Sequence, residues 1–167
     1  TEADLAQARA DLDALIAQNQ PQSDRHDYNE ADTRRDRIDI LLKEAGWDPQ
    51  QPGATEVEVE GMPNESGKGY VDYVLWGDDG KPLALVEAKR ATADPAQGKH
   101  QAVLYANCLE QRYQQRPVIF YTNGYDTWIW DDSRYAPRPI SGFLKKEELE
   151  RLIFRRSQRK RLHLLPI

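Results

Sequence analysis

The sequence predicts an α/β domain in which helices flank a sheet, and three observations support this class. Apolar residues near the amino terminus recur at helical spacing and then change to short runs that are typical of strands. A second helical pattern at 94–115 separates two groups of these runs. Two runs are apolar on both faces, as in strands that lie inside a layered domain. Strands are expected at 55–60, 70–76, 83–89, 117–122 and 126–130.

Two helices are expected before the first strand. The first has apolar residues at helical spacing, namely Leu5, Ala8, Leu12, Leu15 and Ile16. Pro21 and the polar stretch after it are expected to end this helix, because proline lacks the amide donor that a helix interior needs. Asn29 can cap a second helix, which ends at Gly46.

Turn signals connect the strands, and one more helix follows them. Glycine and aspartate at 77–80 predict a hairpin between the second and third strands. Asn123-Gly124 predicts a type I′ turn, so the fourth and fifth strands should pair antiparallel. After a Pro-rich stretch, a last helix is expected at 145–156. The predicted order is therefore αα-βββ-α-ββ-α.

The chain is long enough for one compact domain with a real core. We expect this domain to cover residues 1–150, with a leading helix at 1–20 and the core at about 28–150. Residues 151–167 are expected to form a basic helix end and a linker. No apolar run is long enough to span a bilayer and no segment resembles a signal peptide, which predicts a cytoplasmic protein.

Charge is unevenly distributed along the chain. The formal net charge is -5, whereas residues 134–167 hold ten Lys or Arg and three Asp or Glu, a local balance of +7. The basic end can either contact phosphates or another domain, or form a solvated helix face. The single cysteine, Cys108, excludes an internal disulfide and is expected to be a small buried residue.

Asp72 and Glu87 are carboxylates inside strands that are otherwise apolar, where an unpaired charge is costly. A hairpin loop at Asp79-Gly80 places them directly opposite each other, and a loop at 77–80 places them one diagonal step apart. Either register puts both carboxylates on one face, because side-chain direction repeats every two residues. Lys89 shares this face. A three-residue loop or a bulge would break the relation.

These three groups suit metal-assisted hydrolysis. Two carboxylates are hard oxygen donors for Mg²⁺, and an adjacent water then loses its proton more easily and can attack phosphorus. Lys89 can orient that water, stabilise the transition state, or act as a base if its pKa is lowered. The alternative is a buried ion pair of Lys89 with Asp72 or Glu87 that only stabilises the hairpin, and the spacing alone does not separate the two.

Asp72, fourteen further residues and then Glu87-Ala88-Lys89 resemble the D…(D/E)xK signature of restriction-endonuclease-like nucleases, although Val71 replaces the usual proline. Further segments narrow the resemblance to the N-terminal nuclease domain of type I restriction enzyme R (HsdR) subunits. These segments are Glu30-Ala31-Asp32-Thr33-Arg34, Gly46-Trp47, residues 71–75 and 85–89, residues 101–106, residues 120–124 and the tail 154–167. The resemblance covers about residues 28–167, with the motifs in the family's order.

The resemblance implies a restriction-endonuclease-like core with a mixed sheet, and a Mg²⁺-dependent endonuclease of double-stranded DNA. Asp72, Glu87 and Lys89 then have catalytic roles, with Asp72 and Glu87 as metal ligands. In the full subunit of the family, such a domain precedes an ATP-driven motor and works with methylation and specificity subunits. ATP is therefore expected only for the motor domains, toward which residues 151–167 would lead.

The same resemblance places Gln101 and Tyr105 near the scissile strand, whereas the alternative is a core tyrosine beside an exposed glutamine. Glu30 can add a carboxylate to the metal site, or can act only as an acid in the first turn of a helix. Two other functions remain open. One is a catalytically silent nuclease-fold module that binds DNA or a subunit, and the other is a nuclease that acts on RNA or damaged DNA.

Overall fold

The computed structural model describes the backbone of residues 2–90 and 95–164, and their side chains except those of 13–29, 95–97 and 160–164. The chain divides into two units, Thr1–Asp36 and Arg37–Ile167. The first unit is helical, because α1 (Glu2–Glu44) runs through it and continues into the second. In the part of the chain that the structure describes, no helix combines the length and apolarity needed to cross a membrane.

The predicted break near Pro21 is wrong, since α1 is one helix from Glu2 to Glu44. A proline inside a helix costs about 3 kcal/mol relative to alanine. Alanine, leucine, glutamine and arginine, which favour helices, are frequent on both sides of Pro21 and offset that cost. Gln7 also donates a hydrogen bond to Asp11 one turn later, at 3.3 Å. Asn29 therefore lies inside a helix and does not cap one.

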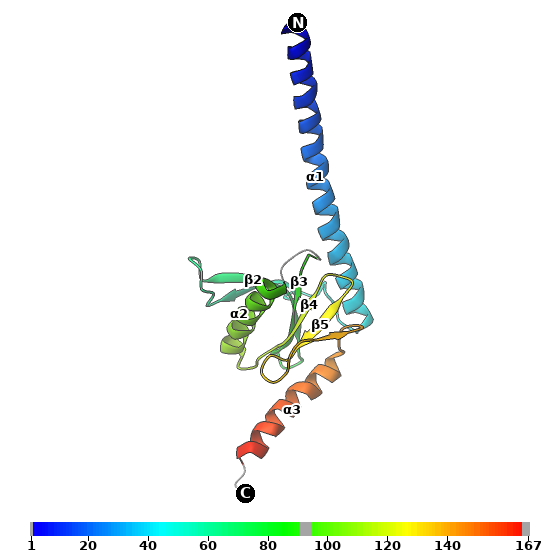
Figure 1. The fold of residues 1–167 in the computed structure, drawn as a ribbon. Helices are drawn as coiled ribbons and strands as arrows, with labels where there is room; N and C mark the ends of the chain where they lie inside the picture. The colour runs from blue at the N-terminus through cyan, green and yellow to red at the C-terminus, as the bar shows by residue number, and fades with distance from the viewer. Residues whose placement is uncertain (1, 91–94, 165–167) are drawn as a thin grey trace. The chain divides into compact units, whose positions relative to one another are not determined.

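The second unit contains a six-stranded sheet in the order of the sequence (Figure 1). Neighbouring strands pair antiparallel, except that β3 and β4 are parallel and are connected through α2 (Pro95–Tyr113). The chain ends in α3 (Lys146–Leu164). The strands are β1 (Thr55–Glu60), β2 (Lys68–Trp76), β3 (Pro82–Ala88), β4 (Val118–Thr122), β5 (Thr127–Trp130) and β6 (Arg138–Ile140). The predicted α/β class with a mixed sheet is confirmed.

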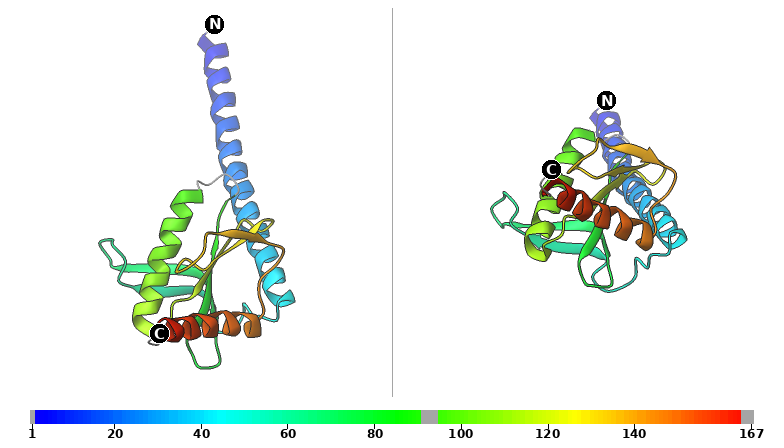
Figure 2. Two further views of the ribbon diagram at one scale, coloured as in Figure 1. Left: turned by 60° about the horizontal axis from the view of Figure 1, so that its bottom comes forward. Right: turned by 90° about the horizontal axis from the view of Figure 1, so that it is seen from below.

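Helices cover both faces of this sheet (Figure 2). On one face, Tyr105 and Leu109 of α2 pack against strand residues that include Leu85 of β3. On the other face, Leu42 at the end of α1 and Leu149 of α3 pack against a second set of strand residues. Because β3 is central, its side chains are buried on both faces, as the sequence predicted.

The loop between β2 and β3 has neither of the two predicted lengths. The amide of Gly77 donates to the carbonyl of Lys81 at 2.9 Å, so the loop consists of Asp78, Asp79 and Gly80. An odd number of loop residues shifts the pairing by one position relative to either predicted register. Alone, this shift would move Glu87 to the face opposite Asp72.

A bulge in β3 cancels the shift. The register changes between Leu75 and Trp76, because β3 carries one extra residue, Leu83, at that point. Beyond the bulge, Tyr73 pairs with Val86, and the same register brings Asp72 opposite Glu87. The predicted pairing is therefore present, although two irregularities produce it where a regular hairpin was expected.

Two further details differ from the predictions. The connection from β4 to β5 is not a two-residue type I′ turn, because it contains the four residues 123–126 and Asn123 lacks a positive φ. The side chain of Asn123 instead accepts hydrogen bonds from the amides of Tyr125 and Asp126, at 2.9 and 2.7 Å, and closes the turn. The short strand β6 was not predicted, because it contains Pro139, which a sheet tolerates at its edge.

The buried side of α3 gives a test of the fold. Leu149 is fully buried, so Leu149→Ala should lower the free energy of unfolding by about 2–5 kcal/mol, as other core truncations do. Phe154→Ala in the same helix is the matched control. Its side chain is 62% exposed, so we expect a change within about 0.5 kcal/mol. Urea unfolding measures both, and equal losses would contradict this orientation of α3.

Candidate functional site

The side chains of Asp72 and Glu87 meet where β2 and β3 pair. The amide of Asp72 donates to Oε1 of Glu87 at 3.3 Å, and the amide of Ala88 donates to Oδ2 of Asp72 at 2.8 Å. Each carboxylate is thus held by a backbone amide of the opposite strand. Glu87 is only 3% exposed, because it lies on the face that α2 covers. The hairpin places the two oxygen donors together at fixed positions.

The electrostatic environment of Glu87 opposes its negative charge. Burial, followed by the charge of Asp72, raises the pKa of Glu87 from 4.5 to about 8. The ammonium of Lys89 acts in the opposite direction, with a smaller effect. At neutral pH Glu87 therefore favours its protonated form when Lys89 is the cation beside it. A further positive charge near Asp72 and Glu87 would favour the ionised form of Glu87.

Lys89 connects the carboxylates to α2. Its Nζ lies 3.6 Å from Oε2 of Glu87 and donates a hydrogen bond to Oε1 of Gln101 at 3.2 Å. The Nε2 atom of Gln101 in turn donates to the hydroxyl of Tyr105 at 2.9 Å. Burial and the charge of Glu87 raise the pKa of Tyr105, which keeps its hydroxyl protonated. The structure thus connects five of the predicted site residues in one group, namely Asp72, Glu87, Lys89, Gln101 and Tyr105.

Two glycines make room for this group, and the sequence interpretation did not identify them. A Cβ atom on Gly98 of α2 would lie 2.7 Å from Cε of Lys89, and one on Gly69 of β2 would lie 2.6 Å from Cε1 of Tyr105. Both distances are shorter than real contacts allow, so any side chain at Gly98 would displace Lys89. Glycine inside a helix costs about 1 kcal/mol relative to alanine, and that cost was the available signal.

The turn after β4 supports the backbone of Lys89. The amide of Lys89 donates to the carbonyl of Thr122 at 2.7 Å. Thr122 is itself buried, and its hydroxyl lies 3.0 Å from that of Thr127 and donates to the carbonyl of Asp126 at 2.9 Å. The threonine of the Thr122-Asn123-Gly124 motif therefore helps to fix the point at which Lys89 leaves β3.

Glu30 lies at an exposed position of α1 in the first unit, so its contribution to a metal site stays a prediction. Among the residues that the structure describes, no group of three His, Cys, Asp or Glu side chains could hold a metal ion. The pair of Asp72 and Glu87 nevertheless fits Mg²⁺, which is commonly held by one or two carboxylates and completes its shell with water and phosphate. A cation beside the pair would counter the burial and the charge of Asp72, which raise the pKa of Glu87.

A solved structure shares this architecture. It is a fragment described as an HsdR subunit of a type I restriction enzyme from Vibrio vulnificus YJ016, and the match has a TM-score of 0.55 and 28% sequence identity. The match covers 73% of this chain and 24% of that chain, so the present chain spans about a quarter of that structure's length. A search of curated proteins gave no significant match.

The sequence profile of the family described as type I restriction enzyme R protein N terminus (HSDR_N) matches residues 53–138. This range is just over half of the chain and runs from the residues before β1 to the start of β6. It includes both carboxylates, Lys89 and the whole of α2. The chain therefore belongs to the family of type I restriction enzyme R protein N-terminal domains.

Proposed function

We propose that this chain is a Mg²⁺-dependent endodeoxyribonuclease domain of a type I restriction-modification enzyme, and that it hydrolyses phosphodiester bonds of duplex DNA. One observation carries the proposal: two carboxylates, the half-buried Asp72 and the buried Glu87, are held together beside the ammonium of Lys89. Membership of the family supports a nuclease role at a coarser level.

Asp72 and Glu87 are the residues that would hold the cation. When bound, the cation supplies positive charge that lowers the pKa of a neighbouring water and offsets charge on the phosphate. Their backbone hydrogen bonds keep both carboxylates in place before any substrate arrives, so little reorganisation is needed.

Lys89 and Tyr105 are placed to contact the DNA strand, and Gln101 holds Lys89 in position. Gln101 accepts a hydrogen bond from Lys89, which keeps the ammonium beside Glu87. From there Lys89 can donate to a phosphate oxygen and stabilise charge that develops in the transition state. Tyr105, whose pKa is raised, can donate its phenolic proton in a hydrogen bond to the same strand.

The charge of the chain favours delivery of the DNA by other parts of the enzyme. A net charge of -5 does not favour tight binding of duplex DNA by this chain alone. We therefore propose that motor domains of the same subunit, together with methylation and specificity subunits, present the DNA. ATP would serve those motor domains. A cytoplasmic location is part of the same proposal.

Substitution of the site residues should abolish cleavage. We expect Glu87→Gln, Asp72→Asn and Lys89→Met each to lower Mg²⁺-dependent plasmid cleavage by the assembled enzyme by about 100-fold or more, because each removes a charge that acts in the transition state. Glu148→Gln, on an exposed position of α3, is the control and should cleave normally. Normal cleavage by the Asp72→Asn enzyme would exclude this site. ATP hydrolysis and DNA binding should persist in all variants.

Metal affinity should depend on pH in a defined direction. Because the pKa of Glu87 is raised to about 8, a proton competes with the cation below that pH. We expect the affinity for Mn²⁺ or Mg²⁺ in titration calorimetry to rise about tenfold per pH unit from pH 6 and to level off above pH 8. Glu87→Gln should bind weakly at every pH. Wild-type affinity that did not change between pH 6 and 9 would contradict the proposed role of Glu87.

Gly98 should matter for activity although it carries no functional group. In Gly98→Ala, the new methyl group must displace the end of the Lys89 side chain, so cleavage should fall about tenfold or more while the fold persists. Gly142→Ala is a matched control, because nothing lies within 4 Å of the Cβ position there. Plasmid cleavage and thermal unfolding are measured for both. Equal activity of the two variants would show that Lys89 does not need this position.

A further inference from the structure

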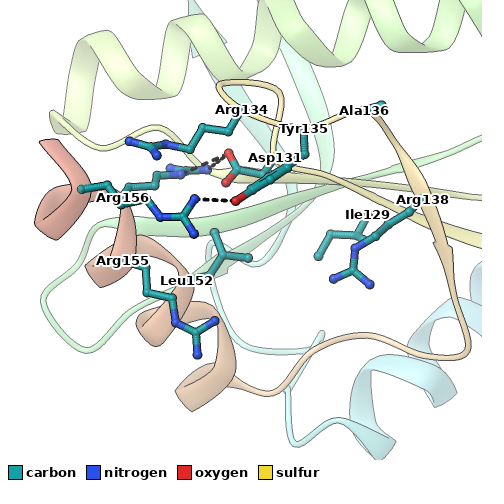
Figure 3. A pocket seen from close by; sticks show the side chains of 10 residues that line it. Ile129, Asp131, Arg134, Tyr135, Ala136, Arg138, Leu152, Arg155 and Arg156 are labelled. Atoms are coloured by element: carbon teal, nitrogen blue, oxygen red, sulfur yellow. Dashed lines mark hydrogen bonds and ion pairs between the residues drawn. The ribbon is translucent and has the colours of Figure 1, made fainter. Parts of the chain in front are cut away.

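A pocket of about 400 Å³ lies between α3 and the segment that joins β5 to β6. Five of its lining residues are arginines, namely Arg134, Arg138, Arg155, Arg156 and Arg159. In Figure 3, Arg155 and Arg156 project from α3, and Arg134 and Arg138 come from the segment around β6. Asp131 supplies the one carboxylate among the lining residues, so the pocket has a formal charge of +4 within an acidic protein.

Two of the five arginines are bound by the protein itself. Arg156 donates to Oδ1 of Asp131 from Nε and Nη2, at 3.2 and 2.8 Å, and to the carbonyl of Arg116 at 2.6 Å. Arg159 donates to the hydroxyl of Tyr135 at 2.6 Å. Asp131 is only 7% exposed, so its pair with Arg156 fixes α3 against the end of β5. The ion pair of Asp131 and Arg156 therefore stabilises the wall of the pocket.

The other three arginines line the same pocket without such partners. Within the described residues, the guanidinium groups of Arg134, Arg138 and Arg155 have no hydrogen-bond or ion-pair partner, and all three residues are exposed. Like charges around one pocket repel each other, and an anion that binds in the pocket relieves the repulsion. A guanidinium presents two parallel donors that match the oxygens of a phosphate group.

We propose that this arginine pocket binds a phosphate group, and that the phosphate is a phosphodiester of the DNA that the domain cuts. The choice of DNA rests on the proposed function, whereas the phosphate chemistry rests on the pocket alone. Ile129 and Leu152, which line the pocket, belong to the core on the face of the sheet that α3 covers. The candidate active site lies on the other face of the sheet, which α2 covers. The pocket would therefore bind DNA at a second place on the domain and add to its affinity for DNA.

The test is DNA binding by a variant in which Arg134, Arg138 and Arg155 are all changed to Gln. This variant leaves the pair of Arg156 and Asp131 intact, and circular dichroism and thermal unfolding check its fold. The control changes three exposed cations outside the pocket to Gln and alters the net charge by the same amount: Lys43, Lys81 and Arg151. Fluorescence anisotropy with a short duplex in EDTA, over a series of salt concentrations, measures affinity without cleavage.

We expect the pocket variant to bind the duplex at least about tenfold more weakly than the wild type. The slope of log affinity against log salt concentration should become less steep by about 1. The control variant should keep the wild-type affinity and the wild-type slope. Equal weakening of the two variants would overturn the proposal, because net charge alone would then explain binding. If duplex binding is unchanged but calorimetric binding of pyrophosphate is lost, the pocket binds phosphate from a free ligand and not from DNA. If neither changes, there is no phosphate site.

The same experiment separates this inference from the proposed function. Binding in EDTA does not depend on Asp72 or Glu87 as metal ligands, so a failed cleavage assay leaves the pocket result valid. A single charge reversal, Arg155→Glu, provides a second variant should the triple variant unfold. It should also weaken duplex binding, and wild-type affinity in this variant would count against the pocket.

Discussion

The parallel pairing of β3 with β4 is the constraint on which the arrangement of the second unit depends. Parallel neighbours cannot be joined by a tight turn, so the chain must cross over one face of the sheet, and α2 provides that crossover. The crossover brings Gln101 and Tyr105 next to the end of β3. It also makes β3 a central strand, so that any charge on β3 must find its partners inside the protein.

Glu87 shows how the fold and the proposed chemistry compete. A carboxyl at this position is desolvated and lies beside a second carboxylate, and one lysine does not restore its ordinary pKa. For stability alone, an apolar residue in its place would avoid this cost. A cation that binds between the two carboxylates would offset this cost. The retention of both carboxylates beside a lysine therefore supports the proposed metal-dependent function.

Much of the second unit could be predicted from the sequence, because strands and helices there have clear periodicities and turn residues. The five predicted strands are present, and so is the facing of Asp72, Glu87 and Lys89. Sequence periodicity failed where tertiary context decides: at Pro21, where the helix continues, and at β6, where an edge position tolerates Pro139. The predicted loop between β2 and β3 was also wrong in length, and only the compensating bulge preserved the conclusion.

Other features could not be predicted because they depend on residues that are distant in sequence. Gly98 matters only because Lys89 lies against it, nine positions earlier and in another element. The arginine pocket similarly combines residues of β5, of β6 and of the segment between them with residues of α3. Composition predicted a basic carboxyl-terminal end, but not that Asp131 would hold part of it in place while three other guanidinium groups are left at the opening.

The bulge at Leu83 has a consequence for how this hairpin can change in evolution. The loop of three residues and the one extra residue in β3 compensate each other, so neither can be deleted alone without turning Glu87 away from Asp72. A deletion that preserves the site must therefore remove one loop residue and the bulge residue together. An alignment of relatives should consequently show paired gaps in this region.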